Sequence, residues 1–168
     1  MSPTHERFDR GRLELRPLAA RDHDMSLDHV LAVGDAPADF DEPALVALAD
    51  AISAARRSGA AVIALMGAHV IKRGLSRYVI DFLRRGWLDA LACNGACAIH
   101  DYELARIGAT TESVAHYIAE GQFGLWRETG EMNDVVHDGA ARGMGFGEAV
   151  GRHIAEGDFP HADASVFA

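Results

Sequence analysis

The chain is poor in lysine, cysteine and long apolar runs, and each shortage narrows the class of protein. Its two cysteines, Cys93 and Cys97, are too few for a disulfide scaffold. A zinc site would need a second pair of ligands, which the sequence does not show. The two cysteines therefore read as buried thiols in a tight turn, and a metal held by Cys-x3-Cys and His100 is the alternative. The sequence has no apolar run of the about 20 residues that span a bilayer, and its polar N-terminus lacks a signal-peptide core. We therefore expect a cytoplasmic protein with no metal.

Net charge limits the possible partners of the chain, and its length limits the number of domains. The 168 residues carry a formal net charge of −9, which repels nucleic acid and anionic membranes. About half of the residues are apolar, and this length is enough for one domain with a sizeable core. We expect neither nucleic acid nor a membrane as a partner.

Apolar spacing predicts alternating helices and strands. Helices are expected at 44–59, 75–86, 98–108 and 110–121, each closed by a glycine, with two further helical pieces within 122–157. Asp39, Asp41 or Pro43 can begin the first helix, and Thr110 or Thr111 can cap the fourth. Short, wholly apolar runs at 60–67 and 87–95 are typical of parallel strands covered on both faces, and 162–168 reads as one more strand.

This order favours an α/β fold, a Rossmann-like parallel sheet with helices on both faces. Residues 1–30 read as an N-terminal arm with an apolar patch at Leu13, Leu15 and Leu18, and residues 31–168 as the domain. Only two clear strands precede the final apolar run, so the sheet looks incomplete. Either the last strand is an edge, or further strands come from another chain or from a longer chain. We favour a unit that needs a partner.

The two strand-end loops are the strongest candidates for a site. Ligands of parallel sheets bind at the carboxyl ends of strands, here Gly67-Ala68-His69 and Asn94-Gly95-Ala96. Small residues let a backbone approach a ligand, and the following helix offers free N–H groups to a phosphate. His69 and His100 can both face this crevice as acids, bases or hydrogen-bond partners. A plain turn at Asn94-Gly95, with Asp101 as a first-turn helix charge, explains the same spacing.

Two other motifs carry weaker signals. "GMGFGEAVG" (143–151) resembles a phosphate loop, but no clear strand precedes it and no Lys-Ser/Thr follows, which favours a glycine-rich helix start. "RETGE" (127–131) reads as a polar turn, with either a capping box from Thr129 or contacts to a cationic substrate.

The segment 64–105 resembles the N-terminal, NAD-binding half of deoxyhypusine synthase. The stretches "GAHVIK" (67–72), "NGACAIHDYE" (94–103) and "RETGE" (127–131) are similar to a bacterial deoxyhypusine-synthase-like branch, which extends the resemblance to most of the chain. A related pattern occurs in the NAD-dependent ornithine cyclodeaminase domain. The motif therefore indicates the fold and cofactor better than the reaction.

The resemblance implies NAD binding in an oligomer, usually a tetramer, with sites at subunit interfaces. By position, it assigns Gly67, Ala68 and His69 to a first cofactor loop and Asn94, Gly95 and Ala96 to a second. His100 and Asp101 would stand where the family's acidic pair approaches cofactor or substrate, although the family has a carboxylate at the position of His100.

The number of lysines limits which reaction this chain can catalyse, because an enzyme that forms an imine with its substrate needs a lysine amine. Lys72 is the only lysine and matches no catalytic position, and the family's catalytic lysine belongs to its C-terminal half. We expect an NAD-binding subunit of an enzyme that oxidises an amine to an imine. The C-terminal half with the catalytic lysine would lie on a second subunit, and Glu128 and Glu131 would contact the substrate. The alternatives are a non-catalytic structural or regulatory partner of an active paralogue, and a cyclodeaminase-like lyase.

Overall fold

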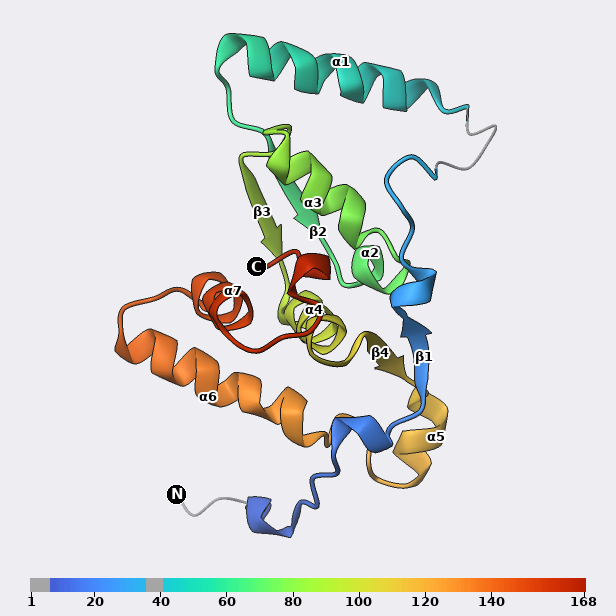
Figure 1. Ribbon diagram of the computed structural model, residues 1–168, viewed down its shortest axis with the longest axis vertical. Coiled ribbons are helices and arrows are strands. Elements are labelled where there is room, and N and C mark those ends of the chain that lie inside the picture. Colours follow the sequence, from blue (N-terminus) through green and yellow to red (C-terminus); the bar gives the residue numbers. More distant parts are fainter. Residues whose placement is uncertain (1–6, 36–40) are drawn as a thin grey trace.

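The computed structural model describes residues 7–35 and 41–168, a mixed α/β arrangement (Figure 1). The strands are β1 (His23–Ser26), β2 (Ile63–Met66), β3 (Ala90–Cys93) and β4 (Ala109–Glu112). The helices are α1 (Pro43–Ser58), α2 (His69–Lys72), α3 (Ser76–Arg84), α4 (Gly95–Ile107), α5 (Val114–Ala119), α6 (Arg127–Ala141) and α7 (Phe146–Glu156). Short 3₁₀ turns lie at Arg10–Arg12, Leu18–Ala20, Leu27–His29 and Ala162–Ala164.

The strands β2 and β3 form the expected parallel pair. Ile63 lies opposite Ala90 and Met66 opposite Cys93, so both strands end at the same edge. The chain crosses between them through α2 and α3. The predictions of strands at 60–67 and 87–95 and of a helix at 75–86 are thus confirmed, with shorter bounds.

The expected helix at 110–121 is wrong in its first half. Gly108 ends α4 with a left-handed backbone, and Ala109–Glu112 then pairs antiparallel with β1, Thr110 opposite Met25. Thr110 and Thr111 are therefore strand residues and not caps, as their β-branched side chains allow. The helix α5 begins only at Val114.

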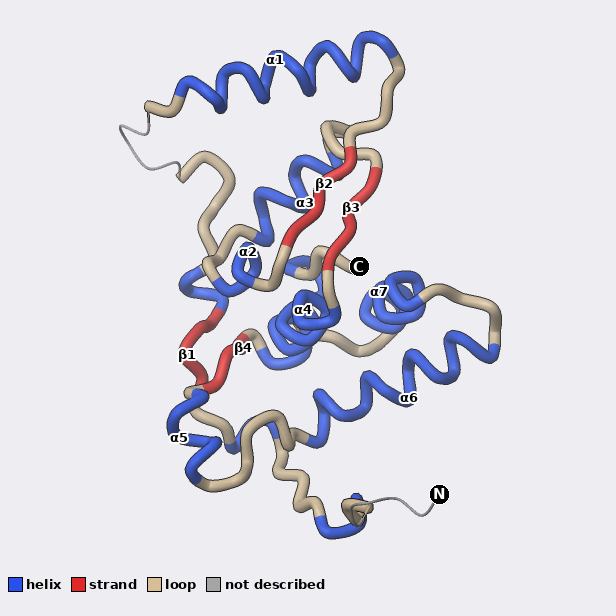
Figure 2. The backbone as a smooth tube through the Cα atoms, turned by 180° about the vertical axis from the view of Figure 1, so that it is seen from behind, coloured by secondary structure: helices blue, strands red, loops and turns tan. Residues whose placement is uncertain are grey.

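The helix α4 lies at the centre of the packed region (Figures 1 and 2). One side, with Ala98, Tyr102 and Ala105, packs on residues of α6, α7 and the following loop. Another side, with Cys97 and Leu104, packs on residues of β1 and α2. Buried on several sides, α4 determines where its polar side chains lie.

Other apolar surfaces remain open among the described residues. In β2 the side chains of Ile63 and Leu65 are 57% and 80% exposed, and Figure 2 shows no helix over the near face of the β2–β3 pair. The helix α1 lies at the margin of the molecule and has no buried residue. Its spacing predicts an apolar face of Leu45, Leu48, Ile52 and Ala55, of which Leu45 and Leu48 are exposed and Ile52 and Ala55 half-buried. Parallel strands are normally covered on both faces, so this sheet has unsatisfied apolar surface.

Several local predictions need correction. The tail 162–168 contains a 3₁₀ turn and no strand. The helix α1 begins at Pro43, as one prediction had it, but Glu42 and not Asp41 is its cap and accepts from the N–H of Ala44. Asp39, another candidate for this start, lies outside the described residues. "RETGE" is not a turn but the start of α6, whereas 143–151 contains the favoured glycine-rich start of α7.

None of the helices in the described residues is long and apolar enough to cross a membrane.

Close packing of α6 on α7 should make Gly139→Ala destabilising. A Cβ at Gly139 would overlap the Cβ of Ala149, so the two helices must separate. We expect a loss of about 1–3 kcal/mol in the free energy of unfolding by urea titration. Gly147→Ala, in α7 with open space around it, is the matched control and should be neutral or stabilising. Equal stability of the two variants would contradict this packing.

Candidate functional site

The carboxyl ends of β2 and β3 meet at the amino end of α4. An open hollow there is lined by Leu65, Met66, Gly67, Ala92, Cys93 and Asn94. Apart from its chain neighbours and the backbone of its own helix, a Cβ at Gly67 or Gly95 would meet no described atom within 4 Å, so both stretches of backbone are open to a ligand. Both predicted loops therefore lie at one edge of the strand pair.

The amino end of α4 has free hydrogen-bond donors. The Oδ1 of Asn94 accepts a 3.2 Å bond from the N–H of Cys97, an N-cap. The N–H groups of Gly95 and Ala96 make no hydrogen bond within the described residues. An exposed helix start with free N–H groups and small residues fits a phosphate or pyrophosphate group.

The two cysteines belong to this edge without forming a metal centre. Cys97 is fully buried, and its Sγ lies 3.7 Å from the carbonyl oxygen of Met66. Burial, followed by the neighbouring Cys97, raises the pKa of Cys93 to about 11, so this thiol is protonated at neutral pH. In the described part of the chain, no three His, Cys, Asp or Glu side chains are grouped to hold a metal.

His100 belongs to a buried polar cluster, the Glu103 cluster, which comprises Arg21, His100, Glu103, Thr110 and Thr129. The Nδ1 of His100 lies 2.8 Å from the Oγ1 of Thr110, which donates a 2.6 Å bond to Glu103. Arg21 donates to both carboxylate oxygens of Glu103, at 2.9 and 2.6 Å, and Thr129 donates at 2.8 Å. The cluster joins the segment before β1 to α4, β4 and α6.

Electrostatics keeps Glu103 ionised and His100 neutral. Burial alone would raise the pKa of Glu103, but Arg21, Thr110 and Thr129 outweigh it and hold the pKa below its usual value. Burial lowers the pKa of His100; Glu103 raises it, and the charges of Lys72, Arg21 and His69 lower it further. His100 is therefore a neutral ring beside a carboxylate.

Asp101 lies in a different environment from His100. Its side chain is fully buried and accepts bonds from Ser165 Oγ (2.5 Å) and the N–H groups of Val166 (2.8 Å) and Phe167 (3.2 Å). Burial raises the pKa of Asp101, while these three donors lower it in part. Asp101 fixes the chain after the last 3₁₀ turn onto α4, and the structure does not bring it together with His100.

The first loop contributes exposed and half-buried groups. Ala68 is buried, His69 begins α2 with an exposed side chain, and Lys72 ends it half-buried. The charges of His69 and Lys72 both act on His100. Both charges lower the pKa of His100 and so oppose protonation of its ring.

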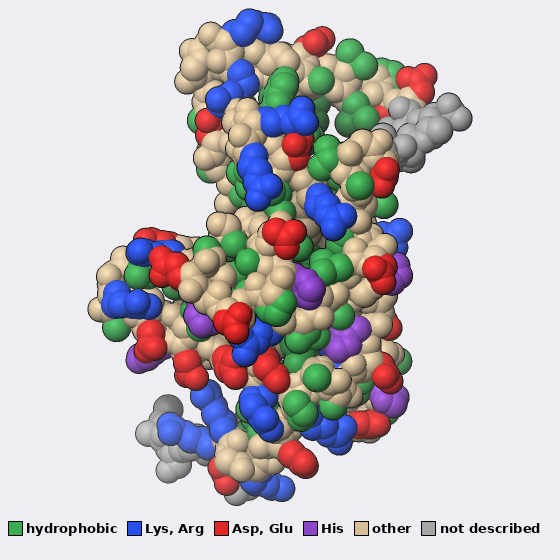
Figure 3. Space-filling view, in the orientation of Figure 1, with side chains coloured by type: hydrophobic (Ala, Val, Ile, Leu, Met, Phe, Trp, Pro, Cys, Tyr) green, Lys and Arg blue, Asp and Glu red, His purple; other side chains and the backbone are tan. Residues whose placement is uncertain are grey.

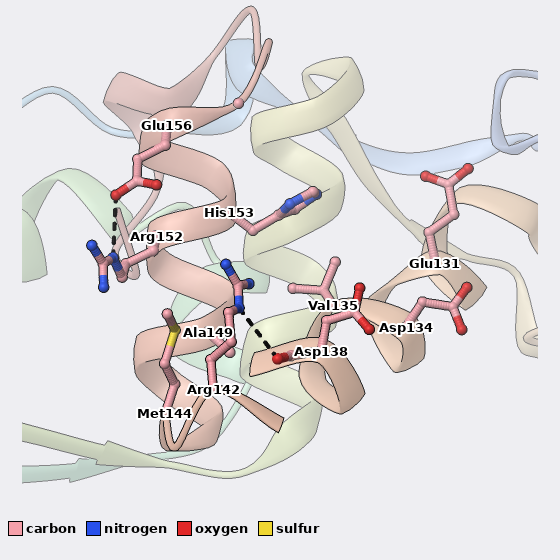
Figure 4. A pocket seen from close by; sticks show the side chains of 11 residues that line it. Glu131, Asp134, Val135, Asp138, Arg142, Met144, Ala149, Arg152, His153 and Glu156 are labelled. Atoms are coloured by element: carbon pink, nitrogen blue, oxygen red, sulfur yellow. Dashed lines mark hydrogen bonds and ion pairs between the residues drawn. The ribbon is translucent and has the colours of Figure 1, made fainter. Parts of the chain in front are cut away.

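The side chains of Glu128 and Glu131, both in α6, lie in different environments. The Oε2 of Glu128 accepts a 2.6 Å bond from the N–H of Leu18 and holds the N-terminal segment. Glu131 is exposed and lines a pocket between α6 and α7, which also contains Asp134, Asp138, Arg142, Arg152, His153 and Glu156 (Figure 4). Figure 3 shows acidic side chains gathered along α6. None of the loop residues lines this pocket.

Sequence reasoning missed Arg21, Glu103 and Thr110. Glu103 is three residues after His100 in a predicted helix, a spacing that places both side chains on one face and was a usable signal. Arg21 and Thr110 had no such signal, because their positions depend on the pairing of β1 with β4.

Comparisons of the chain with protein-family models, with curated proteins and with solved structures gave no match.

The Arg21–Glu103 ion pair should be far more important for stability than an exposed pair. Their side chains are 2% and 1% exposed, so Arg21→Met leaves an unpaired buried carboxylate. We expect a loss of about 3–5 kcal/mol in a denaturant titration. Arg16→Met breaks the pair with Glu120, which is 44% and 41% exposed, and should cost at most about 1 kcal/mol. Similar losses in the two variants would contradict this assignment.

Acidification should weaken the fold through two half-buried histidines, His23 and His100. The pKa values of His100 and His23 are both lowered by burial, so the unfolded chain takes up their protons first. The free energy of unfolding should therefore decrease as the pH falls through about 6.5, towards the folded pKa values. His100→Gln should flatten this dependence between pH 7.5 and about 5.5 in urea titrations. An unchanged slope would show that His100 is not protected from protonation.

Proposed function

We propose that the chain is an NAD-binding, Rossmann-like half-domain of a deoxyhypusine-synthase-like enzyme acting on an amine. The single observation that carries this proposal is the parallel β2–β3 pair, whose two loops of small residues meet at the free N–H groups of α4. This edge is where dinucleotides bind in doubly wound sheets. NAD bound there would accept hydride from the carbon that bears the amine.

The residues of this edge have distinct roles in the proposal. Gly67 and Gly95 leave room for the cofactor, and the N–H groups of Gly95 and Ala96 bind its pyrophosphate. Asn94 fixes the start of α4 and borders the hollow. His100, neutral and half-buried, contacts the amine or the ribose. The exposed Glu131 lies away from this edge, in the pocket between α6 and α7, and adds to the negative charge that attracts a cationic substrate.

The proposal includes a partner that completes the sheet. The open faces of β2 and α1 support it, because exposed Leu45, Leu48, Ile63 and Leu65 are costly in water. Further strands, with the second half of the active site, come from another subunit or from a longer chain, within an oligomer. The same open surfaces equally favour a non-catalytic partner of an active paralogue, so NAD binding is the discriminating property.

The test is an NAD titration by calorimetry, on the 168-residue chain alone and co-purified with the product of the adjacent reading frame. Asn94→Asp should weaken binding about tenfold or more, because it places a negative charge near a phosphate. Aspartate caps a helix as well as asparagine, so stability should not change. Asn94→Ser keeps a capping oxygen without charge and serves as the control.

Two results would reject the cofactor assignment. One is the absence of NAD binding in both the isolated and the assembled chain. The other is equal affinity of the Asp and Ser variants, which would make the Asn94 loop a simple connection. Saturable NAD binding without amine-dependent NADH formation in the assembly would favour the non-catalytic partner.

A further inference from the structure

The hydrogen-bond pattern of the Glu103 cluster determines which nitrogen of His100 carries hydrogen. Each carboxylate oxygen of Glu103 accepts two bonds: Arg21 and Thr129 donate to Oε1, and Arg21 and Thr110 donate to Oε2. A proton on either oxygen would displace one of these donors. Glu103 is therefore an acceptor only.

Thr110 transmits this constraint to His100. A hydroxyl has one hydrogen, and the hydroxyl of Thr110 gives its hydrogen to Glu103. The 2.8 Å contact between Thr110 Oγ1 and His100 Nδ1 can then form only if Nδ1 carries hydrogen and donates it. With hydrogen on Nδ1, Nε2 of the neutral ring has a bare lone pair.

Nothing in the described residues occupies this lone pair. No hydrogen bond involves His100 Nε2, and the ring is half-buried rather than enclosed. The charges of Lys72 and His69 lower the pKa of His100 and so oppose a second proton on the ring. In the described part of the chain, Nε2 is therefore an acceptor without a partner.

We infer that Arg21, Glu103 and Thr110 are positioning residues that hold His100 in the Nδ1–H tautomer, so that Nε2 accepts a hydrogen bond from an N–H or O–H group of the ligand. The ligand part of this inference rests on the proposed function, in which the donor is the amine substrate or a ribose hydroxyl of NAD. The assignment of the tautomer does not depend on the proposed function or on the identity of the ligand.

The tautomer can be measured without any ligand. Long-range ¹H–¹⁵N correlation spectra of the labelled chain at pH 7.5 distinguish protonated from bare ring nitrogens. His100→Gln identifies the His100 signals by their loss, and His137→Gln, at an exposed position of α6, should leave them unchanged. We expect a protonated Nδ1 and a bare Nε2 in the unaltered chain.

Variants of the two threonines separate positioning from general destabilisation. Thr110→Val removes the acceptor of Nδ1–H and should shift His100 towards the Nε2–H tautomer, whereas Thr110→Ser should preserve the Nδ1–H form. Thr129→Val removes a bond to Glu103 but none to His100 and should also preserve it. A bare Nδ1 in the unaltered chain overturns the inference, even if Thr110→Val fails to fold. So does an unchanged tautomer in folded Thr110→Val.

Two additions then identify the donor. NAD alone and 1,4-diaminobutane alone are titrated into the labelled assembly used for calorimetry. A shift of the Nε2 signal with NAD assigns the donor to the cofactor, and a shift with the diamine assigns an amine N–H. If NAD binds by calorimetry but neither addition shifts Nε2, the acceptor role is wrong while the cofactor proposal stands. If NAD does not bind, the cofactor proposal fails and the measured tautomer is unaffected.

Discussion

The buried ion pair between Arg21 and Glu103 is the interaction on which the packed region depends. It joins the segment before β1 to α4, and through Thr110 and Thr129 it also joins β4 and α6. A buried charge is costly unless it is paired and hydrogen-bonded, and here all four acceptor positions of the carboxylate are used, whereas the Nε of Arg21 has no partner among the described residues. The guanidinium group of Arg21 also lies 5.4 Å from the centre of the Trp126 ring, which completes its shielding from water. These bonds fix where β1 meets β4.

The helix α4 connects this constraint to the candidate site. Its first turn offers N–H groups at the carboxyl ends of β2 and β3, and His100 follows one turn later. Asp101 binds the last described segment of the chain, and Glu103 binds Arg21. A single rigid helix therefore positions the loop, the histidine and both buried carboxylates relative to each other. The open faces of β2 and α1 contrast with this packed centre, and they are the physical basis for proposing a partner.

The elements with strong local signals were predictable. The apolar runs before Gly67 and Asn94 became β2 and β3, and the periodic segments ending at Gly59, Gly86 and Gly108 became α1, α3 and α4. The common edge of the two loops followed from parallel pairing. Predictions failed where tertiary contacts outweighed local preference. Thr110 and Thr111 joined β1 in a sheet, and the apolar tail was bound by Asp101 instead of forming a strand.

The sequence by itself determined the mixed α/β pattern, the glycine-closed helices and the polar turn at Asn94, because these depend on spacing along the chain. Only the tertiary structure decided the roles of the neighbouring polar side chains. Asp101 and Glu103 are two residues apart and so point about 200° apart around α4, into different packing environments. One fixes the tail, and the other holds His100 through Thr110. Their functions differ because burial and hydrogen-bond partners come from segments that are remote in sequence.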